Sequence, residues 1–202
     1  MSSYIGYPSF RELRNVDNGT SRHISRARLA AYKGSAMHFI RTLYNSEFAS
    51  EGFTVRNFAR VPNPKYPGDE KYNEALAKAI QSQEYSFLNH MPPKFYNTTN
   101  TTKAKVSQFI TVREGRKLFN IRNYLDIEYD GERPEDLYYG KHSSHVRIPN
   151  VQNSQLQLLQ RDVEIFSDGS IATPDAVAFF GYMGWEKLAD MLPFDYEPNA
   201  EK

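Results

Sequence analysis

Apolar residues recur with a helical period directly after Gly34. Ser35 follows this glycine and can cap the free amides of a first helical turn. Five residues share one face of the helix: Ala36, Phe39, Ile40, Leu43 and Tyr44. We expect an amphipathic helix over residues 35–50 that ends near Gly52, where a left-handed backbone would stop it. An extended segment should begin at Phe53.

A second helical pattern follows a proline-rich loop. Residues 61–68 contain three prolines, which remove backbone donors and disfavour helix, so we expect a loop there. Asp69 can then cap an amphipathic helix over residues 70–84. Residues 21–33 are rich in arginine and only partly helical in pattern. Residues 91–105 are polar and turn-prone, which predicts an exposed connection and the candidate break between two subdomains.

Strand patterns dominate the second half of the chain. Between residues 119 and 129 the apolar period changes to two, which predicts a half-buried antiparallel strand. Its inner face would consist of Phe119, Ile121, Leu125, Ile127 and Tyr129. Further strands are expected over residues 155–166 and 170–173. Asp168 and Gly169 lie between them and favour a tight hairpin turn.

The last elements complete an α+β fold. A short C-terminal helix is expected near residues 184–191, and Pro193 would end it. The predicted architecture is one antiparallel sheet packed with amphipathic helices. We expect residues 1–25 to be an N-terminal extension or the remnant of a preceding domain. Residues 26–198 would form a single α+β domain, and residues 199–202 a tail.

Composition limits the possible functions. Of the 202 residues, 40% are hydrophobic and 24% charged, which is typical of a globular protein. A net charge of +1 gives no basic field that favours nucleic acid. The chain has no cysteine, which excludes disulfides and thiolate catalysis. No apolar run is long enough for a transmembrane segment, and Met1 leads into no signal-peptide pattern. Any export signal is therefore expected outside these residues.

Two histidines form the best candidate metal cluster. His142 and His145 follow the acids Glu135 and Asp136, and imidazole with carboxylate suits zinc. However, glycine, serine and proline around the histidines predict a loop, where a three-residue spacing does not bring the two rings together. Two histidines are also too few for a tetrahedral site. We therefore favour surface histidines and predict no metal and no cofactor.

A third histidine lies in the first predicted helix. His38 precedes the apolar stripe by one position, and a general base there would need a partner and a cleft. We favour a histidine packed beside the stripe and hydrogen-bonded to a neighbouring element. The alternative is a hydrolase acting on peptide or glycan, in which His38, His142, His145 and nearby acids share one cleft.

Other residues have simpler structural explanations. Gly181 and Gly184 match no phosphate-binding loop and are expected to shape a turn. Asp126 and Glu128 could belong to a carboxylate pair for glycoside hydrolysis, but the wet face of a strand explains their alternation. The 14 tyrosines could form a surface on which glycan rings stack, given how often tyrosine occurs at interfaces.

Five groups of residues resemble, in order, the C-terminal region of bacterial carboxypeptidase-like regulatory domain-containing proteins. The resemblance covers most of the chain after about Arg26. The groups are residues 31–35 with 38–43 and 51–53, residues 124–129, residues 152–154, residues 167–169 and residues 181–193. The signature residues that we expect to shape the fold are Tyr32, Gly34, Ser35, His38, Gly52, Asp168, Gly169, Gly181, Gly184, Trp185 and Pro193.

This resemblance implies a setting but no chemistry. In such proteins a signal peptide and a small β-sandwich precede the region, and residues 4–7 are similar to a turn late in the sandwich. A location in the periplasm or outer envelope is therefore implied, while the residues themselves leave a cytoplasmic location open. The family name refers to the sandwich and carries no peptidase residues. We expect a non-catalytic envelope module that binds a partner protein or an envelope polymer, or that orders the attached sandwich.

Overall fold

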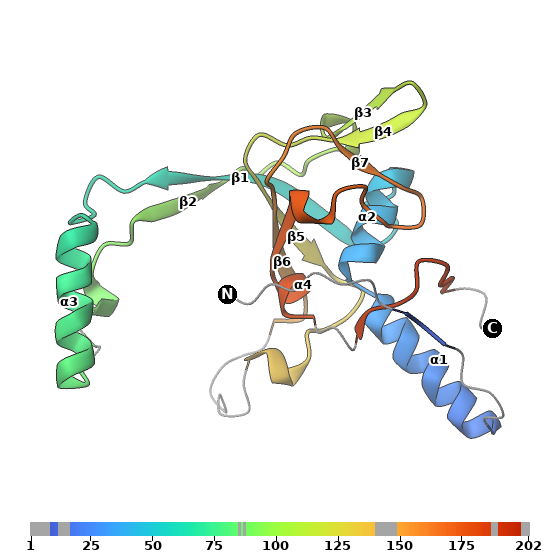
Figure 1. Cartoon of the computed structure of the whole chain (residues 1–202), viewed down its shortest axis with the longest axis horizontal. Helices are drawn as coiled ribbons and strands as arrows, with labels where there is room; N and C mark the ends of the chain where they lie inside the picture. Colours follow the sequence, from blue (N-terminus) through green and yellow to red (C-terminus); the bar gives the residue numbers. More distant parts are fainter. Residues whose placement is uncertain are drawn as a thin grey trace.

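The chain has an α+β fold, as predicted. The computed structural model describes residues 9–11, 17–84, 86, 88–139, 149–186 and 190–198. Within these ranges lie four α-helices and two antiparallel sheets, one of five strands and one of three. Figure 1 shows a compact body with two projections, which end in helices α1 and α3.

The larger sheet has the strand order β2-β1-β5-β6-β8, and every neighbouring pair is antiparallel. Its strands are β1 (Phe53–Pro62), β2 (Phe95–Thr99), β5 (Tyr124–Tyr129), β6 (Gln152–Leu158) and β8 (Val177–Gly181). In β5 the buried residues alternate with half-buried ones, as the period of two predicted.

A second, smaller sheet shows that two predicted strands have the wrong bounds. Its order is β3 (Ile110–Arg113), β4 (Arg116–Phe119) and β7 (Val163–Ile165). The predicted strand 119–129 is split between the sheets, because the backbone N–H of Asn120 turns to the Phe109 carbonyl, 2.8 Å away. The predicted strand 155–166 likewise becomes β6 and β7, separated by a turn in which Asp162 is left-handed, with φ 53°.

The predicted hairpin turn forms, but its return strand is minimal. Phe166 donates its N–H to the Ser170 carbonyl at 3.0 Å, and Gly169 takes φ +85°. Instead of a strand over residues 170–173, the return is a single bridge between Ile165 and Ile171. Glu164 adds one more contact, because its carbonyl accepts the N–H of Ala172 at 3.0 Å.

Helix α1 includes most of a stretch whose pattern was only partly helical, and helix α2 is shorter than predicted. Helix α1 (Asn18–Tyr32) is regular, and the Asp17 carboxylate accepts the N–H groups of its first turn. Helix α2 (Ala36–Asn45) is shorter than the predicted 35–50, because Ser46 takes the left-handed conformation, with φ 67°, and ends it. Gly52 also has positive φ, but it belongs to the turn that enters β1.

The last two helices also correct the prediction. Helix α3 (Asp69–Ser82) has Gly68 as its cap residue, so Asp69 is not the cap; its carboxylate binds Lys94 at 2.6 Å instead. Helix α4 (Tyr182–Trp185) has four residues and begins before the predicted range 184–191. Residues 187–189 of that range lie outside the described part of the chain.

The predicted exposed connection contains a strand. Within residues 91–105, β2 pairs with β1 in a register from Phe58 opposite Thr99 to Pro62 opposite Phe95. Val61 and Pro62, expected in a loop, are the last residues of β1. All five residues of β2 are exposed, so backbone pairing and not burial sets its structure.

The core lies between α2 and the two sheets. Its fully buried side chains come from α2, from β1, β5 and β6, and from β4 and β7: Phe39, Ile40, Leu43, Val55, Leu125, Ile127, Leu156, Phe119 and Ile165. Among the described residues, this core cluster includes none between positions 59 and 103. Those residues therefore lie outside the main core.

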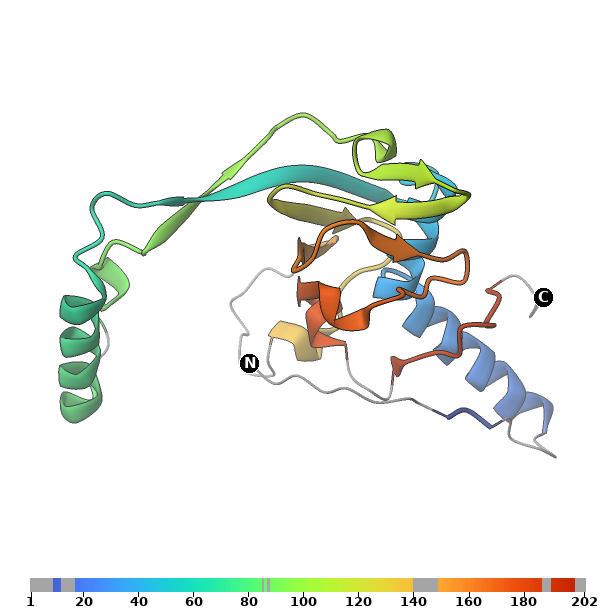
Figure 2. The same cartoon turned by 45° about the horizontal axis from the view of Figure 1, so that its top comes forward.

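We call residues 59–98 the arm. It contains residues 59–62 of β1, residues 95–98 of β2, helix α3 and the 3₁₀ turn η1 (Leu88–His90). Figures 1 and 2 show the two-stranded ribbon leaving the body and α3 standing apart at its end. In α3, Ala79 is buried, and the helix packs mainly against η1 within the arm.

Removing the arm should leave the body folded. We predict that replacing residues 63–94 by Asn-Gly, a two-residue hairpin turn, changes the free energy of unfolding by less than about 1 kcal/mol. Pro62 and Phe95 already face each other, so the new turn joins residues that are paired in the native structure. Urea unfolding followed by tryptophan fluorescence measures the effect. A loss of cooperative unfolding would show that the arm belongs to the folding unit.

Candidate functional site

The signature segments meet at the start of α2. Gly34 joins α1 to α2 with φ +76°, and a Cβ there would lie 1.9 Å from the Gln152 Oε1 atom and 2.8 Å from the Tyr129 ring. Only glycine fits this conformation and this spacing. Ser35 caps the helix, because its Oγ accepts the His38 N–H at 3.1 Å. The Gln152 Oε1 atom is buried and has no hydrogen-bond partner among the described residues.

His38 is packed in this junction and is only 3% exposed. Its Nδ1 accepts the Gly34 N–H at 3.2 Å, and its Nε2 lies 3.2 Å from the Glu51 Oε2 atom. Because Nδ1 accepts, the proton of the neutral ring is on Nε2 and is donated to Glu51. Both ring nitrogens are therefore occupied, and His38 has no free lone pair for general base catalysis.

The surroundings of His38 lower its pKa. Burial among the rings of Tyr32, Phe53 and Tyr129 is the largest cause, and the charge of Arg41 adds to it. The hydrogen bond and charge of Glu51 act in the opposite direction but are weaker. The ring is therefore neutral at pH 7, in agreement with Nδ1 as an acceptor.

Arg41 is the residue that sequence reasoning missed. It is 7% exposed, and its guanidinium donates to three backbone carbonyls, those of Asp168 at 3.0 Å, Tyr196 at 2.8 Å and Phe194 at 2.9 Å. Among the described residues its one carboxylate neighbour is Glu197, whose Oε1 atom is 4.0 Å away. The signal in the sequence was an arginine placed among the apolar stripe of the predicted helix, between Ile40 and Leu43. In the structure every residue from 38 to 43 is buried.

The remaining signature residues lie at close contacts. Gly181 has φ +72°, and a Cβ there would lie 2.6 Å from the Asn153 carbonyl, so the turn from β8 into α4 requires glycine. Next to it, the Met183 N–H donates to the Ser154 Oγ at 3.0 Å. A Cβ at Gly184 would lie equally close to the Phe179 carbonyl.

Three more signature residues hold turns together. Asp168 closes the hairpin turn, since its carboxylate accepts from the backbone and side chain of Ser170. The Gly52 carbonyl accepts the Asp130 N–H at 3.1 Å, and the Pro193 carbonyl accepts the Tyr196 N–H at 3.0 Å.

An aromatic and acidic cluster lies beside α4. The Trp185 ring is 5.6 Å from those of Tyr138 and Tyr182. Burial, and then the charge of Asp190, raise the pKa of Glu186 to about 8, although this carboxylate also accepts the Ala36 N–H at the start of α2. The acid is therefore largely neutral at pH 7.

The two acids of β5 share the face of the strand that points away from the core. Asp126 and Glu128 lie on the half-buried face of the strand, opposite the core residues. Glu128 forms an ion pair with Arg56 at 2.8 Å. Burial, and then the charge of Glu128, raise the pKa of Asp126.

Two predicted site residues, His142 and His145, lie outside the described residues. In the described part of the chain, no group of three or more His, Cys, Asp or Glu side chains could hold a metal ion. An open cavity of about 600 Å³ lies near the end of α2, lined by Phe48, Val106 and Lys117 among others, and no predicted site residue lines it.

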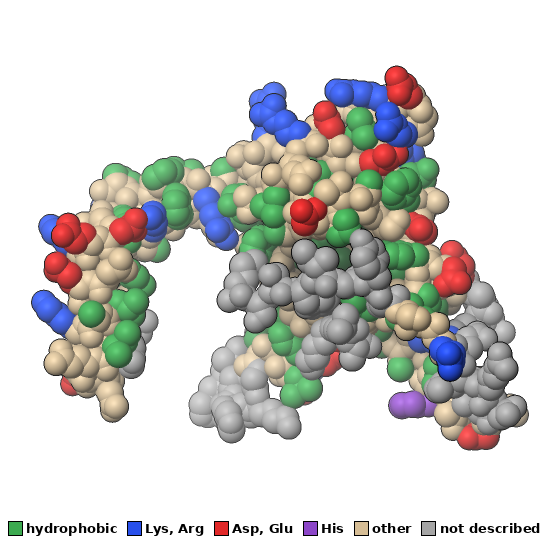
Figure 3. All heavy atoms as spheres, in the orientation of Figure 1, with side chains coloured by type: hydrophobic (Ala, Val, Ile, Leu, Met, Phe, Trp, Pro, Cys, Tyr) green, Lys and Arg blue, Asp and Glu red, His purple; other side chains and the backbone are tan. Residues whose placement is uncertain are grey.

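The arm carries three large, exposed apolar side chains. Ile80, Phe95 and Tyr96 are 59%, 43% and 45% exposed. Figure 3 shows an open space between α3 and the body, with apolar side chains on the side of α3 that faces it. At the root of the ribbon, the Arg60 guanidinium lies 4.8 Å from the centre of the Tyr124 ring, which also stacks on Phe58. The root is therefore held to the body, and the rest projects away from it.

Comparison of the chain with protein-family models, curated proteins and solved structures found no match. The resemblance to the envelope family therefore depends on the five groups of residues described above. Among the described residues, no helix has the length and apolar character to cross a bilayer.

The pH dependence of stability should report His38. Because its pKa in the folded chain is below the ordinary 6.5, the unfolded chain binds more protons between those two values. The stability contribution is complete above about pH 6.5 and decreases as the pH falls toward the folded pKa. Glu186, whose pKa is raised, acts in the opposite direction over the same range, but it is present in both proteins. We therefore predict that urea unfolding shows the wild type losing stability relative to His38→Phe as the pH falls through this range.

The same variant leaves the Gly34 N–H and Glu51 without the imidazole. At pH 7.5 its free energy of unfolding should be about 1–3 kcal/mol lower than that of the wild type, because a buried donor is left unsatisfied. The matched control is His23→Gln, since His23 is exposed. A pH dependence unchanged in His38→Phe would contradict the assignment.

Arg41 should be required for the attachment of the C-terminal segment. We predict that Arg41→Met lowers the free energy of unfolding by about 3 kcal/mol and removes the hydrogen-exchange protection of the Tyr196 amide. Arg41→Lys should recover less than half, because a single ammonium cannot reach three carbonyls. Arg122→Met, at an exposed position, is the control. Equal stability of Arg41→Met and the control would refute this role.

Proposed function

We propose that the chain is a non-catalytic binding module of the bacterial cell envelope whose arm binds a partner protein. The observation that carries this proposal is the arm itself, a two-stranded ribbon with an amphipathic helix that packs outside the core. The envelope setting follows from the resemblance of the five groups of residues. The proposal assigns folding to the body and recognition to the arm.

Physical chemistry supports a partner for the arm. An isolated two-stranded ribbon is only marginally stable in water, and β2 is the edge strand of its sheet, with backbone groups available on its outer side. Covering the exposed parts of Ile80, Phe95 and Tyr96 would contribute about 1 kcal/mol each. That sum is smaller than the cost of association, so a partner must add backbone pairing or ion pairs.

The junction at α2 supports a non-catalytic body. Three polar side chains there have structural roles, since Ser35 caps a helix, His38 joins two turns and Arg41 holds three carbonyls. A hydrolase would need a nucleophile or base with a free lone pair facing a cleft. His38 does not meet this requirement.

Site-specific crosslinking tests the function of the arm. A photo-reactive amino acid at Ile80 or Phe95 should give a discrete protein adduct in intact bacteria that express the chain. The control position is Leu159, which lies on the body and is 59% exposed. The adduct should disappear when excess non-reactive wild-type chain is coexpressed, but not when the excess chain has residues 63–94 replaced by Asn-Gly.

The opposite result is equally clear. Adducts of similar yield at Leu159 and at the arm positions would show non-specific exposure, and no adduct at the arm would remove the proposal.

A further inference from the structure

Two exposed helices carry matching ridges of opposite charge. In α1, Arg22 and Arg26 are exposed and one turn apart, and the helix contains no acidic residue. In α3, Glu70 and Glu74 are exposed at the same four-residue spacing. We call these pairs the basic ridge and the acidic ridge. Within the described chain, none of the four residues forms an ion pair.

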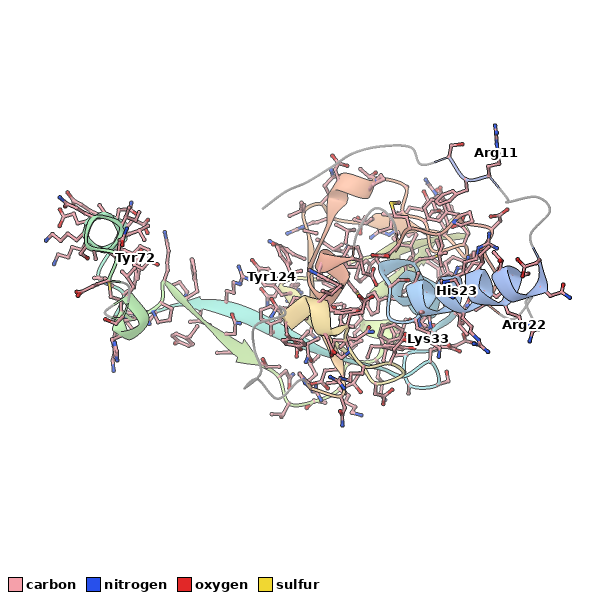
Figure 4. The ribbon with its side chains drawn as sticks, turned by 90° about the horizontal axis from the view of Figure 1, so that it is seen from below. Arg11, Arg22, His23, Lys33, Tyr72 and Tyr124 are labelled. Atoms are coloured by element: carbon pink, nitrogen blue, oxygen red, sulfur yellow. The ribbon has the colours of Figure 1, made fainter. Side chains whose placement is uncertain are left out.

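Both helices project on the same side of the molecule, at opposite ends. Figures 1 and 2 show α3 at the end of the arm and α1 at the far end of the body, both extending away from the ribbon. Figure 4 views the chain from that side, with Arg22 near the free end of α1 and α3 seen end-on. The separation is too great for the two ridges to meet within one chain.

We propose that the partner of the arm is a second copy of this chain. A two-fold axis that brings the projecting sides face to face places α3 of each copy beside α1 of the other, which closes the assembly as a dimer. The free end of α1 is its N-terminus, and α3 leaves the ribbon at its N-terminus. Glu70 therefore faces Arg22 of the second copy, and Glu74 faces Arg26.

Beyond the charged pairs the two helices differ. Ala77 and Lys78 lie three and four residues after Glu74 and extend its side of α3, whereas Leu29 and Ala30 occupy the same positions after Arg26 on α1. Ala77 and Lys78 would therefore lie beside Leu29 and Ala30 of the second copy. Ile80, six residues after Glu74, lies on a different side of α3.

The ion pairs would contribute more to the specificity of the dimer than to its stability. Each exposed ion pair contributes about 0.2–1 kcal/mol, and the two-fold axis doubles the number of pairs. The dimer should therefore be weak and sensitive to salt, and it should dissociate in about 1 M salt, where the screening length is about 3 Å. Complementary charge also rejects the wrong register, because like charges would then face each other.

Mixing two charge-reversed variants tests the arrangement. The first variant is Arg22→Glu with Arg26→Glu, and the second is Glu70→Arg with Glu74→Arg. Each alone brings like charges together at both contacts, so its dimer dissociation constant in sedimentation equilibrium should rise at least about tenfold. Mixed in equal amounts, the two variants regain attraction at both contacts. The mixture should therefore form a heterodimer of wild-type affinity.

The control reverses equal charge elsewhere, with Lys103→Glu and Arg122→Glu at exposed positions that form no ion pair in the described chain. It should dimerise like the wild type, and circular dichroism should show that every variant is folded. A wild-type chain that stays monomeric in low salt at every concentration would overturn the proposal, as would a dimer insensitive to both reversals or a mixture that fails to recover.

This inference rests on the proposed function of the arm, and the two can fail separately. If purified chain is monomeric while arm positions still crosslink in bacteria to a different protein, the dimer is wrong and the binding function stands. If neither experiment gives an adduct or a dimer, both are wrong. A chain that binds anionic vesicles through Arg22 and Arg26, and does not dimerise, also overturns the second copy.

Discussion

Arg41 carries a permanent positive charge into the interior, and the architecture around α2 depends on how that charge is held. Its partners are neutral carbonyls of Asp168, Phe194 and Tyr196, which lie more than 120 residues away in sequence. A guanidinium can serve three such acceptors at once because its donors diverge in one plane. The hairpin turn and the C-terminal segment are therefore fixed to the same helix that fills the core.

The start of α2 shows why its buried histidine, His38, is not evidence of catalysis. His38 connects the Gly34 turn with Glu51, so its two nitrogens stabilise two chain reversals. Burial keeps the ring neutral, which this pair of bonds requires. Polar groups that are fully used by their own fold leave little for a substrate. This is why we propose recognition for the arm, whose groups are not used by the core.

Local patterns predicted some elements and failed on others for identifiable reasons. The start of α2 and the alternation in β5 follow from apolar periodicity, because both elements have one face in the core. Strand β2 lacks such a face, and only pairing with β1 makes it a strand. The period of two also continues across Asn120, where the chain changes sheets. Glu51 and Arg41 were missed because their partners are not local in sequence.

The way the arm is attached allows its surface to change without changing the folded body. Because β1 and β2 leave and enter the body side by side, the residues between them are joined to the rest of the chain through one narrow connection. If the arm binds as proposed, substitutions beyond that connection would alter what the protein recognises with little effect on how it folds. Such a chain can acquire new specificity in small steps, and a foreign loop or reporter inserted at the same connection would be carried in the same way.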